Sequence, residues 1–259
     1  MTTPLKKNIP RPCPEQVKIY LEKWEKLDAY PEQEKALDKL FLKLCPKNEK
    51  IEDILLKCAT LNDFYSTNIF SVFPVAKHIL ELGIDSRLAK GDVSLVDELQ
   101  TVNIQGDVHK FYSFASKYCS HHKPTVFPIY DSYVDRVLRY FRREYKFVTF
   151  KNEDLKNYKI FIEILDSFMD YHGLKGFSRK EIDRYLWLLG KRKLPQNQSK
   201  KIGELTSVKF FDSFGNINIS DYFDPEELIK IRTTKGAPIE FLLFVQKSKL
   251  RKPPNMYFP

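Results

Sequence analysis

Apolar residues recur three and four positions apart through most of the first 190 residues, the spacing that places them on one face of an α-helix. Residues 14–27 begin with a proline and put five such side chains on one side: Val17, Tyr20, Leu21, Trp24 and Leu27. Similar spacing predicts helices over residues 34–45, 51–58, 132–145, 155–174 and 178–190. With only 9 glycines, the chain is poorly suited to the many turns of a sandwich or barrel. The predicted fold class is all-α.

The pattern divides the chain into a helical domain, residues 1–190, and a C-terminal part, residues 191–259. In the first domain, we expect helices within residues 14–60 to pack on a core formed by residues 61–190. A polar, basic, proline-bearing linker is expected at residues 191–201. A small appendage follows, with a hairpin around Gly215 and a short helix over residues 225–233.

Gly106 lies between two segments with helical spacing, residues 92–99 and 108–119. Glycine is the residue that most readily adopts the backbone conformations of a tight turn. The sequence therefore predicts a helix–turn–helix centred on Gly106.

The charge balance is basic: 43 Lys and Arg face 34 Asp and Glu, which gives a net charge of +9. A positive surface attracts polyanions, and nucleic acid is the first candidate partner. An ordinary basic soluble protein is the alternative, because net charge alone does not identify a partner.

The four cysteines are Cys13, Cys45, Cys58 and Cys119, and none forms the short paired spacing of a zinc or iron–sulfur site. His121 and His122 follow closely after Cys119, but sequence neighbours rarely converge on one metal ion. We therefore expect reduced thiols, no metal and no cofactor. The N-terminus lacks an apolar signal core, and no run of about eighteen apolar residues occurs. A cytoplasmic monomer without membrane contact is expected.

Asp131 stands between an apolar run and the predicted helix over residues 132–145. Aspartate is among the best N-cap residues, so capping explains its position without any further role. Arginines on the same helix lie away from its apolar face and form either a solvated surface or a set of phosphate contacts. The alternative for Asp131 is a catalytic carboxylate that the start of this helix presents to a site.

Residues 127–138, "FPIYDSYVDRVL", resemble the segment of the helix-hairpin-helix DNA glycosylases in which an apolar run ends in the catalytic aspartate. The segment is particularly similar to the version in adenine glycosylases, relatives of endonuclease III. Residues 62–79 resemble an early helix of that superfamily, and residues 181–191 resemble its last helix. The resemblance covers about residues 50–190 and implies a two-lobed helical fold, here without an iron–sulfur cluster.

The resemblance implies that Asp131 is the catalytic residue. Tyr65, Ser66 and Thr67 match the positions that wedge the opened duplex, and Tyr130 and Tyr133 are candidates for stacking on a base. Core packing is the alternative for each tyrosine. The expected contacts to the DNA backbone are Gly106, Lys110, Arg136, Arg139, Arg142 and Arg143.

The sequence also departs from the superfamily. The usual hairpin reads Leu-Pro-Gly-Val-Gly, and residues 102–106 keep only Gly106. Bifunctional members place a nucleophilic lysine just after the hairpin, where this chain has Val108. The implied activity is therefore monofunctional.

The function expected from the resemblance is excision of a modified or damaged base from double-stranded DNA by base flipping and Asp-assisted hydrolysis. A bulky modified base of phage DNA, removed in antiviral defence, is one such substrate. The first alternative is a catalytically inactive DNA-binding module on the same scaffold. The second is a helical protein-interaction domain, which would show no salt-dependent affinity for DNA.

Overall fold

The computed structural model describes residues 9–194, 209–212 and 215–218. The chain divides into two units, Met1–Asn197 and Gln198–Pro259, and each is described by itself. In the described residues there are ten α-helices and two antiparallel sheets of two strands each. The predicted helical class is confirmed, since both sheets are short hairpins. No helix among these residues is long and apolar enough to cross a membrane.

One set of elements in the first unit, which we call the first helical group, spans residues 51–122. It contains α3 (Ile51–Tyr65), α4 (Val72–Leu82), α5 (Asp85–Lys90), α6 (Leu95–Leu99), β1 (Thr101–Ile104), β2 (Asp107–Lys110) and α7 (Tyr112–His122). Helix α3 packs on α4 and α7, and α6 also packs on α7. Helix α7 is the core element of the group, with nine of its 11 residues buried.

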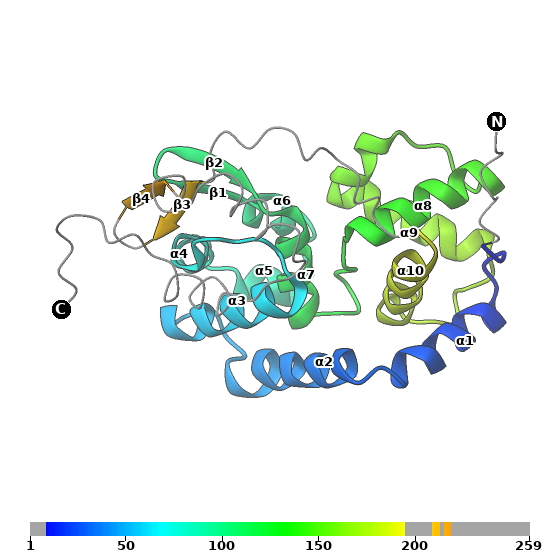
Figure 1. Ribbon diagram of the computed structural model, residues 1–259, viewed down its shortest axis with the longest axis horizontal. Helices are drawn as coiled ribbons and strands as arrows, with labels where there is room; N and C mark the ends of the chain where they lie inside the picture. Colours follow the sequence, from blue (N-terminus) through cyan, green and yellow to red (C-terminus); the bar gives the residue numbers. More distant parts are fainter. Residues whose placement is uncertain (1–8, 195–208, 213–214, 219–259) are drawn as a thin grey trace. The chain divides into compact units, whose positions relative to one another are not determined.

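The second helical group combines the N-terminal helix with the helices that follow residue 131. It contains α1 (Pro14–Glu25), α8 (Ser132–Tyr145), the 3₁₀ helix η2 (Asn152–Lys156), α9 (Tyr158–Tyr171) and α10 (Arg179–Lys193). Helix α10 packs on both α1 and α8. Helix α2 (Ala29–Lys39) and its π-helical continuation η1 (Leu40–Leu44) connect α1 with α3 and α7, and thus join the two groups (Figure 1).

The predicted helix–turn–helix at Gly106 is wrong, because residues 101–110 form the β1–β2 hairpin. Gln105 and Gly106 both have positive φ angles, 54° and 94°, as the two central residues of a tight hairpin turn require. The Gly106 N–H donates to Asn103 Oδ1 at 2.9 Å and closes the turn. Each strand has only four residues, so its alternation is too short to stand out from the helical spacing on either side.

The start of α10 is confirmed and its end is not. The Ser178 hydroxyl accepts from the Glu181 N–H at 3.3 Å, and the Glu181 carboxylate accepts from the Ser178 N–H at 2.7 Å, which forms a capping box. The helix continues past Gly190, its predicted end, to Lys193. Gly190 serves close packing instead, since a Cβ atom there would lie 2.9 Å from Tyr133 Cβ on α8.

In the second unit, β3 (Lys209–Asp212) and β4 (Gly215–Asn218) pair in an antiparallel hairpin, which confirms the hairpin predicted around Gly215. The predicted linker, residues 191–201, begins inside the last turn of α10. Its residues 195–201 and the helix predicted over residues 225–233 lie outside the described residues.

Gly190→Ala is expected to destabilise the first unit. The new methyl group would press on the Cβ and carbonyl oxygen of Tyr133, neither of which can rotate away. Overpacking of this kind costs about 1–3 kcal/mol, against a helix-propensity gain of about 1 kcal/mol. Urea unfolding followed by circular dichroism measures the net loss. Gly176→Ala is the matched control, because it adds a methyl group in open space. Equal stability of the two variants would contradict close packing of α8 on α10.

Candidate functional site

Asp131 is the N-cap of α8, as its position in the sequence predicts. Its Oδ1 accepts from the Tyr133 N–H at 2.7 Å, so the carboxylate satisfies the first turn of the helix. Its other oxygen, Oδ2, lies 3.4 Å from the Lys117 ammonium. The Asp131 side chain is 16% exposed. Capping therefore occupies one carboxylate oxygen and leaves the other in an ion pair.

Lys117 is a site residue that sequence reasoning missed. Its side chain is 2% exposed, although it carries a charge. The ammonium donates to the Ser113 hydroxyl at 2.5 Å and lies 5.2 Å from the centre of the Tyr65 ring. A buried ammonium is costly unless it is paired and hydrogen-bonded. No local pattern in the sequence singles out Lys117, because the same helix also carries three serines and two histidines.

Asp183, on α10, is a second carboxyl group close to Asp131. The residue retains some exposed surface, but its Oδ1 is buried and accepts no hydrogen bond from any described residue. Burial, followed by the negative charge of Asp131, raises the pKa of Asp183 well above the ordinary range of aspartate, while Lys117 acts against the shift. The site therefore combines a carboxylate paired with a lysine and a carboxyl group that favours its protonated form.

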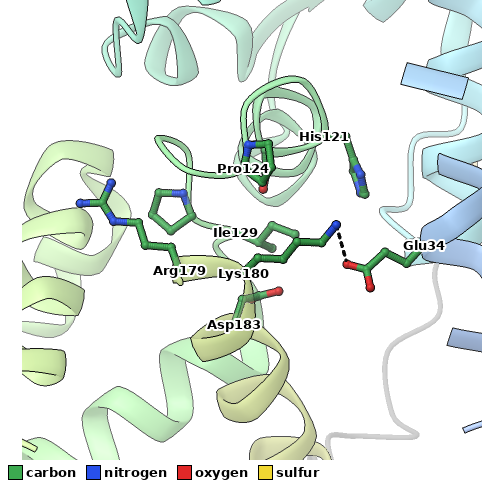
Figure 2. Close-up of a pocket in the computed structure, with 9 residues that line it drawn as sticks. Glu34, His121, Pro124, Ile129, Arg179, Lys180 and Asp183 are labelled. Carbon is green, nitrogen blue, oxygen red and sulfur yellow. Dashed lines mark ion pairs between the residues drawn. The ribbon is translucent and has the colours of Figure 1, made fainter. Parts of the chain in front are cut away.

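Polar side chains from three other helices surround Asp183. His121 Nε2 on α7 lies 3.0 Å from the Tyr65 hydroxyl, and its Nδ1 lies 3.8 Å from Asp38 on α2. Hydrogen bonding from His121 lowers the pKa of Asp38. Lys180 on α10 pairs with Glu34 on α2 at 3.0 Å, and Figure 2 shows this pair between His121 and Asp183. These contacts join α2 to α10 beside the two carboxyl groups.

A small cavity lies among these side chains. Asp183, His121, Glu34 and Lys180 line it, together with parts of the segment that leads to Asp131. Its water-accessible volume is about 10 Å³, which is room for about one water molecule. A nucleobase can occupy this space only after side chains at the rim move. Lys180 and Glu34, which pair with each other, are two of the long side chains that line it (Figure 2).

Of the residues predicted to wedge or stack, the structure brings Tyr65 to the site, at the end of α3 and beside Lys117 and His121. Ser66 follows with a left-handed backbone, and the Thr67 hydroxyl donates to Asn62 at 2.7 Å. Tyr130 is 4% exposed, and its hydroxyl donates to Asp135 at 2.8 Å, so it is a core residue with no free face. The Tyr133 ring is half-buried and packs edge-on against Trp187.

The predicted contacts to the DNA backbone lie in two places. Gly106 and Lys110 belong to the hairpin, where the Gly106 N–H is already bonded to Asn103. The arginines lie on α8, and three of them bind groups of the protein itself. Arg136 donates to the Leu194 carbonyl at 3.2 Å, Arg139 pairs with Asp135, and Arg142 donates to the Phe150 carbonyl at 2.5 Å. Arg143 is exposed and lies 5.9 Å from the Tyr140 ring.

The raised pKa of Asp183 predicts a specific pH dependence of stability. In the folded state this group keeps its proton to higher pH than in the unfolded chain, where an aspartate titrates near pH 4. Folding then takes up a proton, so the stabilisation is complete below about pH 4 and is lost as pH rises through the folded-state pKa. Asp183→Asn removes this titration with little change in shape.

Urea unfolding of the wild type and Asp183→Asn between pH 4 and pH 9 tests this expectation. The wild type is expected to lose more stability than the variant over that interval. Asp170→Asn is the control, since Asp170 is exposed on α9 and pairs only with Lys175 among the ion pairs of the described residues. Parallel stability curves for the wild type and Asp183→Asn would show that Asp183 ionises normally in the folded protein.

Part of this site lies in a segment of the chain that matches a known protein family. The model of the family HI_0787_N, described as an N-terminal domain, matches residues 16–126. That region includes Tyr65, Lys117 and His121 and ends before Asp131. An uncharacterized protein of Haemophilus influenzae is 51% identical over 150 residues, which cover 58% of this chain and 72% of that protein. No solved structure matches the chain. The chain belongs to the family of this Haemophilus protein.

Proposed function

We propose that the protein is a monofunctional DNA glycosylase, which hydrolyses the bond between a modified or damaged base and its deoxyribose. The observation that carries the proposal is the position of Asp131. Its carboxylate is fixed by the cap of α8 and by Lys117, and its charge acts on Asp183, a second carboxyl group that lines the cavity. Together with the resemblance of residues 127–138 to the glycosylase segment, this arrangement favours glycosidic hydrolysis.

The chemistry of this reaction requires a fixed negative charge. As the bond from sugar to base breaks, positive charge develops on the sugar, as in other glycoside hydrolyses. A carboxylate held near the anomeric carbon stabilises that charge and orients the attacking water. Asp131 is held at two points, through Tyr133 N–H and Lys117, so it needs little reorganisation during the reaction.

The finer fold assignment, a helix-hairpin-helix glycosylase-like fold, is part of the same proposal. Two helical groups and a chain that crosses from α7 to α8 through Asp131 support it. The β1–β2 hairpin stands where the superfamily has its helical hairpin. We infer that Lys110 and Arg143, which are both exposed, contribute to DNA binding. They take the place of the hairpin backbone N–H groups that would otherwise bind a DNA phosphate.

A base reaches the cavity in this proposal by displacing the Lys180–Glu34 pair. Both side chains are long, and Glu34 also binds Arg184 at 2.5 Å, so the lysine and the carboxylate can separate without leaving Glu34 unpaired. DNA phosphates compete with Glu34 for Lys180 and favour the open arrangement. The substrate proposed is double-stranded DNA with a flipped nucleotide, including bulky modified bases of phage DNA. This choice of substrate rests on the family resemblance.

The second candidate function is a catalytically inactive DNA-binding module. The size of the cavity favours it, since about 10 Å³ holds no base without rearrangement. This candidate predicts salt-dependent binding to DNA and no release of bases.

Asp131→Asn separates the two candidates. Asparagine caps helices as well as aspartate does, so the start of α8 should be kept, but the amide cannot supply the negative charge and leaves the buried Lys117 ammonium without its counter-charge. Thermal unfolding of the variant therefore has to show a folded protein before its activity is compared with that of the wild type. We expect wild-type protein to release free base from genomic DNAs of differing modification, detected by mass spectrometry. The variant should release it at least about 100-fold more slowly, with nearly unchanged DNA affinity.

Asp170→Asn, an exposed acid on α9, is the matched control and should behave as wild type. Equal rates of release by wild type and Asp131→Asn would contradict the proposed mechanism. DNA binding without release of any base would favour the binding module instead.

A further inference from the structure

We propose that Asp183 is the general acid of this site and protonates the base as it leaves. The inference rests on the proposed glycosidic hydrolysis and adds a second catalytic residue, on α10, to Asp131 on α8. The two carboxyl groups then have different tasks, and the difference follows from what surrounds each of them.

The geometry of Asp183 is unusual for a buried acid. It lines the cavity, where Figure 2 shows it facing the same space as Lys180 and His121. Its Oδ1 is buried and accepts no hydrogen bond within the described part of the chain. A buried polar atom left without a partner is costly and needs an explanation. A carboxyl group kept ready to donate to a ligand in the cavity supplies that explanation.

The neighbouring polar groups are already paired with one another. Glu34 binds Lys180 and Arg184, and His121 contacts the Tyr65 hydroxyl. The cavity therefore contains one acid whose hydrogen-bonding capacity is unused, beside ion pairs that hold their own charges. Asp131 is the nearest group that could share the task, and its oxygens are committed to Tyr133 N–H and Lys117.

Four charged side chains act on Asp183: Asp131 at the N-cap of α8, Lys117 on α7, Glu34 on α2 and Arg184 on α10 itself. The two carboxylates favour the protonated acid, whereas the two cations oppose it, and burial is the largest influence. Their sum raises the pKa of Asp183, as a group that must carry a proton near neutral pH requires.

The bond from the anomeric carbon to the base nitrogen breaks, and its electron pair remains on the base. The base takes the proton of Asp183, and a water molecule adds to the anomeric carbon. That water gives its proton to Asp131 or onward to solvent, and Asp183 regains a proton from solvent. The net change is DNA plus water to free base plus an abasic site.

The test is a set of single-turnover pH profiles of base release for wild type, Asp183→Asn, Asp183→Glu and Asp131→Asn. The wild-type rate should fall at high pH, as Asp183 loses its proton. Asp183→Asn should be slower by about 100-fold or more near neutral pH, because it lacks a transferable proton, and its profile should lack the alkaline fall. Asp183→Glu, which restores a proton donor, should recover part of the rate and an alkaline fall.

DNA affinity and thermal unfolding of each variant serve as controls for folding. A folded Asp183→Asn that releases base at the wild-type rate, with the wild-type pH profile, would overturn this inference and leave the role of Asp131 in place. Loss of activity in Asp183→Asn without any recovery or alkaline fall in Asp183→Glu would also overturn it, in favour of a structural role. Absence of release by the wild type on every DNA would overturn the proposed function together with this inference.

Discussion

The ion pair between Lys117 and Asp131 is the contact on which the rest of the site depends. Lys117 is almost fully buried, and its ammonium is stable there because it donates hydrogen bonds to the Ser113 hydroxyl, the Tyr130 carbonyl and Asp131. The same pair joins α7 of the first helical group to the start of α8 in the second. Loss of either partner leaves an uncompensated charge, so the contact fixes both the entry of the chain into α8 and the position of the carboxylate.

Capping and catalysis are compatible roles for Asp131 because a carboxylate has two oxygens. One oxygen closes the first turn of α8, and the other faces Lys117, so the cap holds the group in place without neutralising it. Asp183 lies on α10, where burial favours its protonated form. Helix α10 packs against α8 at the close approach of Gly190 to Tyr133. Helix packing thus places the Lys117-paired carboxylate of Asp131 near Asp183, an acid that lines the cavity and whose protonated form is favoured by burial. Acid-assisted hydrolysis uses such a division of roles.

Features that depend on neighbouring residues in the sequence could be predicted, and features made by tertiary packing could not. The helices follow from local apolar spacing, and the caps at Asp131 and Ser178 follow from residue type at a helix start. Lys117 and Asp183 reach Asp131 only through the packing of α7 and α10, which no local pattern encodes. The engagement of Arg136 and Arg142 with backbone carbonyls likewise arises from the fold, since their helical face alone indicated free arginines.

The effect of burial and of the Asp131 charge on Asp183 can be tested on the protein without substrate. Carbon-13 NMR of aspartate-labelled protein, with the Asp183 signal assigned from Asp183→Asn, follows the titration of this carboxyl group directly. We predict a midpoint well above the ordinary range for aspartate, which falls when Asp131→Asn removes the adjacent negative charge. A midpoint in the ordinary range, unchanged in Asp131→Asn, would show that neither burial nor Asp131 holds the proton on Asp183.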